Sequence, residues 1–475
     1  MVMGNSMKRK LIWSFSLLLF IGSLSVVQGH EGWNDKEEDS VLPSVDSATP
    51  NDNVYYVSVK NGSNRNNGSK DAPFKDLQKA VDAAEEGSTI YVSEGNYLGK
   101  LNQGYIEVKK YISIVGGFSS DFSSWDPTRY ITSIRPGVEQ AGTSGSHGLL
   151  DIYVRGNRKG VVLIDGLSFD KGQMNAYCEA ITNNPVAAAP EGCETGRMVL
   201  VGESPVGTKV GGAPLAQQLI HGNVEGEVII RNCTFVNAYH FAIEMGCVAG
   251  HFDIYNNVFV ANRMAACEVR GMNADPSLCS IDFHHNTVLF SWCRTKVMDT
   301  MGLGFRYMTG INANVYNNIF GCSNLAALER TFVDGNAKKE AMRVTSATNN
   351  RFFMNSADLI LPSGGGKWTK VPADQFEDVE QLKEYEGNKE LDENEAFIKA
   401  IDAAYLKGFA SISIKQSQDY QPNSAANQVN RIFGLNQQGT ETIRVTMFAN
   451  RYPFEKAFAL FGVVKGFGAQ KPEKR

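Results

Sequence analysis

The clearest pattern along the chain is a short segment of alternating apolar and polar residues that recurs six times. Aligned on one apolar residue, the copies are VLIDGLSF, VIIRNCTF, FDIYNNVF, IDFHHNTV, ANVYNNIF and TSATNNRF. Their anchors are Phe169, Phe235, Phe259, Val288, Phe320 and Phe352, at successive spacings of 66, 24, 29, 32 and 32 residues. Positions five and seven before the anchor are mostly apolar and the positions between them mostly polar, which predicts β-strands with one buried face.

A corner residue stands three places before each anchor, and Asn predominates there. The corner residues are Gly166, Asn232, Asn256, His285, Asn317 and Asn349. Asn tolerates the left-handed backbone conformation and can hydrogen-bond along a stack of identical turns. The corner and the spacing predict a parallel solenoid whose rungs stack roughly 4.8 Å apart. The predicted core comprises Val162, Ile164, Val228, Ile230, Phe252, Ile254, Ile281, Phe283 and Val315.

The segments on either side of the rungs have other patterns. Near Val54 a strand pattern begins, and a stretch with apolar residues at helical spacing follows at residues 74–84. We expect this helix to cover the first end of a solenoid that spans residues 53–355. From Ser356 the rung pattern stops and helix-favouring stretches follow, so residues 356–475 are predicted to form a C-terminal cap of helix and loop. The alternative is a separately folded binding domain.

At this point the sequence resembles the right-handed parallel β-helix proteins of the pectate-lyase-like superfamily. The resemblance rests on YYVSVKNGS followed by PFKDLQKAVDAAEEGSTIYVSEGNY, on ISIVGGFSSDF, and on the NNVF and NNIF rungs. It covers roughly residues 54–355 and implies an all-β, single-stranded parallel β-helix with an N-terminal helical cap. A fold of this kind does not fix a function.

The first residues have the layout of an export signal. Lys8, Arg9 and Lys10 precede an apolar run from Leu11 to Val27, so residues 1–29 are predicted to be a cleaved signal peptide rather than a retained anchor. Residues 30–52 are acidic and turn-rich and predict a flexible leader. No later stretch could span a bilayer. The predicted destination is the periplasm, the cell surface or the extracellular space.

The charge of the chain bears on nucleic-acid binding, and its cysteine content bears on disulfide formation. The net charge of −5 and the absence of a basic tract argue against a nucleic-acid partner. All eight cysteines fall between Cys178 and Cys322, and an exported chain can use them in disulfides. Cys178 and Cys193 are the favoured pair, whereas Cys233, Cys267 and Cys293 fit small buried apolar side chains equally well.

The same alignment shows a second column, of acidic residues. Glu244, Glu268 and Glu329 each follow their anchor by nine residues and end an Ala-apolar-Glu triplet. In the rung between the last two, the alignment places Thr295-Lys296-Val297 instead. If the middle residue of each triplet faces the core, both Ala and Glu face outward, and Glu244 and Glu268 stand about 5 Å apart on adjacent rungs.

Three hypotheses compete for this column. In any of them, the repulsion between two close carboxylates must be relieved, either because the pKa of one carboxyl group rises or because a cation such as calcium binds. A glycoside hydrolase would use two carboxylates. A polysaccharide lyase would use a base and a group that neutralises a uronate carboxylate, and the candidates for these roles are Arg270, Lys296, Arg306 and Tyr307. The third hypothesis is a structural network of charge pairs on a solvated face.

Other side chains offer weaker signals. Tyr255 and Tyr316 are candidates for a platform that stacks on sugar rings, although packing beneath the C-terminal cap is equally compatible with their positions. His284 is a candidate acid or base, whereas His285 occupies the corner column. The chain lacks both the paired aspartates with a downstream GHG of polygalacturonases and the WIDH pattern of pectate lyases, so a standard pectinase is not expected.

The functional prediction is therefore a secreted carbohydrate-active protein. Its expected partner is an acidic extracellular polysaccharide, which it binds or cleaves as a lyase or a glycoside hydrolase. The alternative is a non-catalytic cell-surface adhesin or glycan-binding scaffold.

Overall fold

The computed structural model describes a single compact unit within Pro50–Arg475. The described residues are 53–100, 105–135, 147–170, 216–238, 241–291, 302–323, 325–330, 343–364, 367–391, 397, 400–402, 405 and 452–473. The predicted signal peptide and leader, together with Cys178, Cys193 and Lys296, lie outside them. Among the described helices, none has the length and apolar character needed to cross a membrane.

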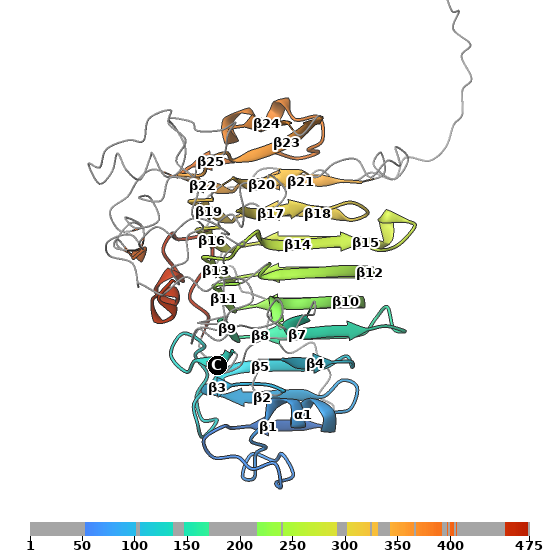
Figure 1. Cartoon of the computed structure of the whole chain (residues 1–475), viewed down its shortest axis with the longest axis vertical. Helices are drawn as coiled ribbons and strands as arrows, with labels where there is room; N and C mark the ends of the chain where they lie inside the picture. Colours follow the sequence, from blue (N-terminus) through green and yellow to red (C-terminus); the bar gives the residue numbers. More distant parts are fainter. Residues whose placement is uncertain are drawn as a thin grey trace, which may run out of the picture. The chain divides into compact units, whose positions relative to one another are not determined.

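The described strands stack in parallel, rung upon rung, from β1 to β23 (Figure 1). One 16-stranded sheet has two branches that meet where β10 and β12 bend, and a 9-stranded sheet B forms the remaining face. Branch A1 contains β1 (Val54–Val57), β2 (Thr89–Ser93), β5 (Ser113–Phe118), β8 (Val161–Asp165), the second halves of β10 (Ala216–Arg231) and β12 (Ile243–Tyr255), β15 (Cys279–His284), β18 (Asn312–Tyr316) and β21 (Thr345–Thr348).

Branch A2 contains β4 (Ile106–Val108), β7 (His147–Val154), the first halves of β10 and β12, β14 (Ala265–Gly271), β17 (Leu303–Tyr307), β20 (Ala326–Arg330) and β23 (Leu359–Gly364). Sheet B contains β3 (Gly95–Tyr97), β6 (Thr132–Ile134), β9 (Ser168–Asp170), β11 (Thr234–Val236), β13 (Val258–Val260), β16 (Thr287–Leu289), β19 (Ile319–Gly321), β22 (Arg351–Phe353) and β25 (Lys389–Glu390). This arrangement confirms the predicted parallel β-helix.

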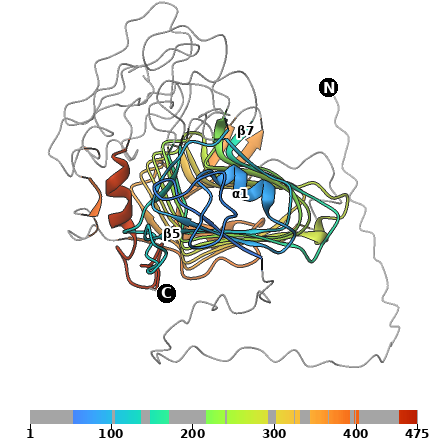
Figure 2. The same cartoon turned by 90° about the horizontal axis from the view of Figure 1, so that it is seen from below.

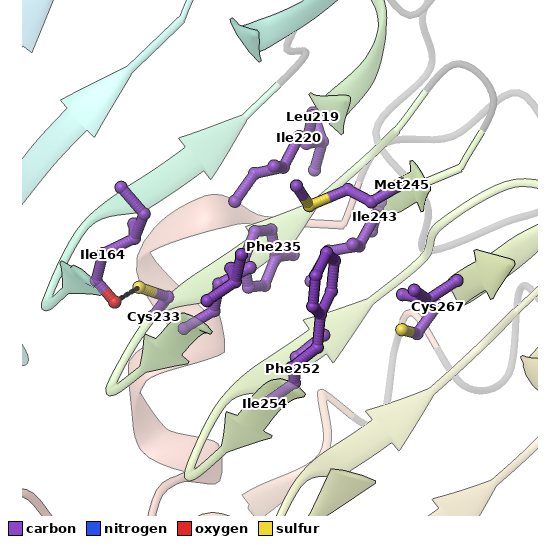
Figure 3. Packing of buried hydrophobic residues seen from close by; sticks show 14 of the residues in the cluster. Ile164, Leu219, Ile220, Cys233, Phe235, Ile243, Met245, Phe252, Ile254 and Cys267 are labelled. Atoms are coloured by element: carbon purple, nitrogen blue, oxygen red, sulfur yellow. Dashed lines mark hydrogen bonds between the residues drawn. The ribbon is translucent and has the colours of Figure 1, made fainter. Parts of the chain in front are cut away.

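The interior is filled by the apolar columns of the sequence pattern. All nine predicted core residues are fully buried, and so is Ala313 of the same columns. The anchor rings stack from rung to rung, with Phe235 and Phe259 at a centroid distance of 4.6 Å and an angle of 10° between their planes. Figure 3 shows how side chains from successive strands, among them Ile164 and Phe252, meet inside the coil. Burial on one face of each strand therefore holds the rungs in register.

The corner column has the predicted left-handed backbone, with φ of 54° at Asn232 and 56° at Asn317. The main hydrogen-bonded ladder, however, uses the next residue. The backbone N–H of Asn257 donates to Oδ1 of Asn286 at 3.0 Å, and the N–H of Asn286 donates to Oδ1 of Asn318 at 2.9 Å. These amides satisfy buried backbone donors that the turn leaves without a strand partner.

The helix α1 (Leu77–Ala83) lies across the first end of the coil, as Figure 2 shows. Asp76 caps it, since its carboxylate accepts a hydrogen bond from the backbone N–H of Gln78 at 2.9 Å. Leu77, Ala80 and Val81 are buried against the main core. The apolar end of the solenoid is thereby kept from water.

At the other end, parallel pairing continues past the predicted boundary at residue 355. β23 pairs in parallel with β20, and β25 pairs in parallel with β22. β24 (Lys367–Val371) then folds back antiparallel on β23. Part of the region expected to be helical forms the 3₁₀ segment η5 (Ala373–Asp378). The rung pattern was lost there because the apolar alternation in these strands is short and irregular.

The C-terminal segment covers the outer side of sheet B. The 3₁₀ segment η6 (Phe454–Leu460) contributes to a second apolar cluster that includes Val236, Val260 and Leu289 from sheet B. Hydrogen bonds also join the C-terminal segment to the solenoid. The backbone N–H of Tyr452 donates to Oδ1 of Asn237 at 2.8 Å, and the backbone N–H of Gln470 donates to Oδ1 of Asn256 at 2.6 Å. Residues 452–473 therefore pack on the side of the solenoid.

Candidate functional site

The outer side of branch A2 carries one column of ionisable residues that runs along successive rungs. Register pairing places its members opposite one another in the order Glu107, Asp151, His221, Glu244, Glu268, Arg306 and Glu329. Their strands bury the preceding residue in each case, for example Ile220 before His221 and Ile243 before Glu244. Alternation of side chains along a strand then turns the ionisable residue outward. We call this set the ionisable column.

The predicted pair of Glu244 and Glu268 occupies adjacent rungs of this column, as expected. One guanidinium joins them, because the same terminal nitrogen of Arg270 lies 3.5 Å from Oε1 of Glu244 and 2.7 Å from Oε1 of Glu268. Arg270 is itself 48% exposed. The repulsion between the two carboxylates is therefore relieved by a cationic side chain.

The end of the column toward β20 is a closed ion-pair network. Glu268 is only 2% exposed, and its second oxygen accepts a hydrogen bond from Arg306 at 2.8 Å. Arg306 also donates to Glu329 at 2.5 Å. Burial raises the pKa of Glu329, and the charge of Arg306 opposes that rise. This part of the column matches the hypothesis of a structural charge network.

Three expectations from the sequence are wrong here. The rung between Glu268 and Glu329 is supplied by Gly304-Phe305-Arg306 and not by the expected triplet Thr295-Lys296-Val297, because β14 pairs with β17 and β17 with β20. The alanines of the Ala-apolar-Glu triplets, such as Ala266, are buried in the core rather than outward. Tyr307 is also a core residue, and its hydroxyl donates to the carbonyl of Ser346 at 2.8 Å. Tyr307 cannot contact a substrate from this position.

The end of the column toward β7 has a different composition, which the sequence prediction missed. Nδ1 of His221 lies 3.4 Å from the buried carboxylate of Asp151 and 3.1 Å from the hydroxyl of Tyr153. Asp151 is held in place by the backbone N–H of Gly148 at 2.6 Å. Among the described residues, Nε2 of His221 has no hydrogen-bond partner. An Nδ1 proton shared with Asp151 and Tyr153 would leave Nε2 with its lone pair available.

Glu244 and Tyr153 flank this histidine. Oε2 of Glu244 accepts a hydrogen bond from Nε2 of Gln218 at 2.6 Å, and the carboxylate keeps 21% of its side-chain surface exposed. Tyr153 is 38% exposed and its ring meets that of His221 edge-on at 5.8 Å. Burial, followed by the charges of Asp151 and Glu244, raises the pKa of Tyr153. A protonated phenol, an imidazole and a carboxylate thus share one exposed patch.

Unequal connections explain why Asp151 and His221 were missed. The anchor-based count finds a glutamate nine residues after Phe235, Phe259 and Phe320, but Arg306 comes 18 residues after Val288 and His221 comes 52 after Phe169. A local signal was present in the six A2 strands from β7 to β20, since two small or apolar residues precede an ionisable one. The triplets are Leu149-Leu150-Asp151, Leu219-Ile220-His221, Ala242-Ile243-Glu244, Ala266-Cys267-Glu268, Gly304-Phe305-Arg306 and Ala327-Leu328-Glu329.

The other predicted binding residues lie on branch A1. Tyr255, His284 and Tyr316 are register neighbours whose rings stack at centroid distances of 4.9 and 4.6 Å. Tyr255 is buried and accepts a hydrogen bond from Arg231 at 2.8 Å, so its predicted role as an exposed platform is wrong. His284 and Tyr316 are half-buried, and Nε2 of His284 lies 3.0 Å from Asp253. These three residues do not belong to the ionisable column.

The described part of the chain contains no group of three or more His, Cys, Asp or Glu side chains arranged to hold a metal ion. Three carboxylates of the column contact arginines, namely Glu244, Glu268 and Glu329. Glu268 in particular has both oxygens bonded to guanidinium groups.

Of the ionisable column, the family model that matches the chain includes only Glu107. Residues 60–122 match a family described as a protein of unknown function (DUF1565). No curated protein matches the chain. A similar solved structure is the GH136 lacto-N-biosidase from Eubacterium ramulus, with 9% sequence identity, a TM-score of 0.30 and coverage of 65% of this chain. The match spans 57% of that enzyme's chain, which is less than two thirds. None of these comparisons names the pectate-lyase-like superfamily.

Proposed function

We propose that the outer face of branch A2 binds an acidic polysaccharide and cleaves it by β-elimination at His221. The observation that supports this most is the placement of His221, with Nδ1 facing Asp151 and Tyr153 and Nε2 without a partner among the described residues. Export directed by residues 1–29 is part of the same proposal, since polysaccharides of this class are extracellular.

In the proposed reaction, Nε2 of His221 removes the proton on the carbon next to the uronate carboxylate. The electron pair of that C–H bond forms a carbon–carbon double bond, and the bond to the glycosidic oxygen breaks. The leaving oxygen takes a proton from the Tyr153 hydroxyl, which lies 3.1 Å from Nδ1 of His221. Its raised pKa keeps the phenol protonated at neutral pH. Arg270 is exposed enough to pair with the uronate carboxylate and stabilise the charge that develops.

Hydrolysis by two carboxyl groups fits the same patch less well. Such a mechanism needs one carboxylic acid that can give a proton to the leaving oxygen. Oε1 and Oε2 of Glu244 contact Arg270 and Gln218, and both oxygens of Glu268 contact arginines. Glu329 has a raised pKa but is buried beneath Arg306.

The test is a screen of the purified chain against uronate polysaccharides, with both ultraviolet absorbance and new reducing ends measured. Elimination predicts that the two signals rise together, because each cleavage creates one unsaturated product. His221→Asn is expected to lower kcat by about 10²- to 10⁴-fold while polysaccharide binding changes little. His251→Asn is the matched control, because His251 is a partly exposed histidine beside Asp282 on branch A1.

The outcomes separate the alternatives. Reducing ends without absorbance would indicate a hydrolase. Binding without turnover would indicate the non-catalytic glycan-binding scaffold. Equal activity of His221→Asn and wild type would remove His221 from the mechanism, and the absence of any uronate binding would overturn the proposal.

A further inference from the structure

Two cysteines on neighbouring rungs stand together at the bend between branches A2 and A1. Cys247 lies on β12 and Cys279 is the first residue of β15, and both side chains are fully buried. The Sγ–H of Cys279 donates to the carbonyl of Cys247 at 3.1 Å. The Sγ–H of Cys247 donates to the carbonyl of Gly250 at 3.5 Å, and Gly250 is the register partner of Cys279. Both are free thiols in this structure.

We propose that Cys247 and Cys279 form a disulfide that joins the β12 and β15 rungs when the protein meets a disulfide oxidant. Although the register partner of Cys279 is Gly250, three residues after Cys247, the 3.1 Å contact places Sγ of Cys279 directly beside the backbone of Cys247. Disulfides bridge Cα atoms about 4.4–6.8 Å apart, so the pair needs only a local adjustment of the bend. The backbone at this bend is irregular, because the β10–β12 register shifts between Val224 and Glu225. Because the ladder is irregular here, the two cysteines can approach each other more freely than residues in a regular ladder can.

The two thiols also differ in pKa, which favours thiol–disulfide exchange. They interact through their side chains, and this hydrogen bond lowers the pKa of Cys279 while it raises that of Cys247. A thiolate is the attacking species in thiol–disulfide exchange, so Cys279 is the first nucleophile. The three other described cysteines, Cys233, Cys267 and Cys322, have raised pKa values because they are buried.

Access to Cys279 comes from the loop that precedes it. This loop runs from β14 to β15 and includes the 3₁₀ segment η3 (Pro276–Leu278). Met272 is 48% exposed, and Asn273 holds the loop to the rung below through a hydrogen bond to the carbonyl of Val248 at 3.0 Å. Local opening of such an exposed loop costs less free energy than global unfolding.

The chemistry balances with oxidised glutathione as the oxidant. The Cys279 thiolate attacks one glutathione sulfur and releases the first reduced glutathione. Cys247 then loses its proton to solvent and attacks the Cys279 sulfur of the mixed disulfide, which releases the second. Two protein thiols are oxidised and one glutathione disulfide is reduced.

The test treats the full chain with oxidised glutathione, blocks the remaining thiols by alkylation and identifies linked peptides by mass spectrometry. We expect a peptide pair joined through Cys247 and Cys279, and a melting temperature about 2–5 °C higher than that of the reduced protein. Cys279→Ser and Cys247→Ser should each abolish the link and the shift. Cys267→Ser, which removes another buried thiol of the same core, should preserve both.

Two results would overturn the proposal. One is complete alkylation of Cys247 and Cys279 in denaturant after oxidation, which would show that both stayed reduced. The other is a link from either residue to a different cysteine. The readout does not depend on polysaccharide binding, so its result and that of the activity screen are independent.

Discussion

Glu244 and Glu268 show how one rung can change the role of a residue. They are the same residue type in the same column, yet Glu268 is 2% exposed and bonded to two arginines, whereas Glu244 is 21% exposed and bonded to Gln218 and Arg270. A buried carboxylate between guanidinium groups compensates their charge in a region of low dielectric. A partly exposed one keeps water as an alternative partner and can exchange it for a ligand.

This difference predicts opposite effects of the same substitution. Glu268→Gln should lower the free energy of unfolding by about 3–5 kcal/mol, because it leaves Arg306 partly uncompensated in a buried site. Glu244→Gln should change it by less than about 1 kcal/mol and instead weaken polysaccharide binding or turnover. Chemical denaturation measures the first effect and the activity screen the second. If Glu268→Gln were as stable as wild type, the structural role of the network would be wrong.

At the scale of the elements, the corner column is where the repeat is held together. Its residues have positive φ, and the following Asn residues pass hydrogen bonds from rung to rung. His285 replaces the usual Asn of the column, with φ of 50° and Nδ1 2.7 Å from Nδ1 of His284. Burial, together with the neighbouring His284, lowers its pKa from 6.5 to about 4.

The lowered pKa predicts a specific dependence of stability on pH. The folded protein holds His285 neutral, whereas the unfolded chain binds a proton near pH 6.5. The stabilising contribution is therefore complete above about pH 6.5 and is lost as the pH falls toward 4. His285→Asn, which restores the usual corner residue, should remove this part of the decline. Thermal unfolding of both proteins from pH 8 to pH 4 measures it, and parallel curves throughout would contradict the assignment.

At the scale of the whole molecule, the C-terminal segment completes the solenoid by covering the outer side of sheet B. Val236, Leu289 and Ile319 point away from the main core and are buried in a second cluster with Leu460 and Phe461. Without that cover they would form an exposed apolar patch along several rungs. Patches of this kind promote association.

Truncation after Arg451 therefore predicts a folded but association-prone solenoid. The variant should keep its β-rich circular dichroism spectrum, bind a hydrophobic dye more strongly and show larger species in size-exclusion chromatography. Gln470→Ala, which removes the side-chain hydrogen bonds of Gln470 to the carbonyls of Val464 and Phe467 and leaves the apolar contacts, is the control and should resemble wild type. Unchanged dye binding after truncation would mean that the segment does not protect this face.

The sequence alone determined the repeat, the buried columns and the left-handed corners, because each depends on residues a few positions apart on one strand or turn. Phe283 was predicted to face inward and is fully buried, and Asn317 was predicted to be a corner and has positive φ. The tertiary structure decided which residues stand opposite one another across rungs. His221 meets Glu244, and Arg306 stands beside Glu268 in the rung that the alignment gave to Thr295-Lys296-Val297, because connections of unequal length return to the same register. Pairing between parallel strands depends on backbone hydrogen bonds and on burial, and the number of residues between two positions in the sequence gives no information about either.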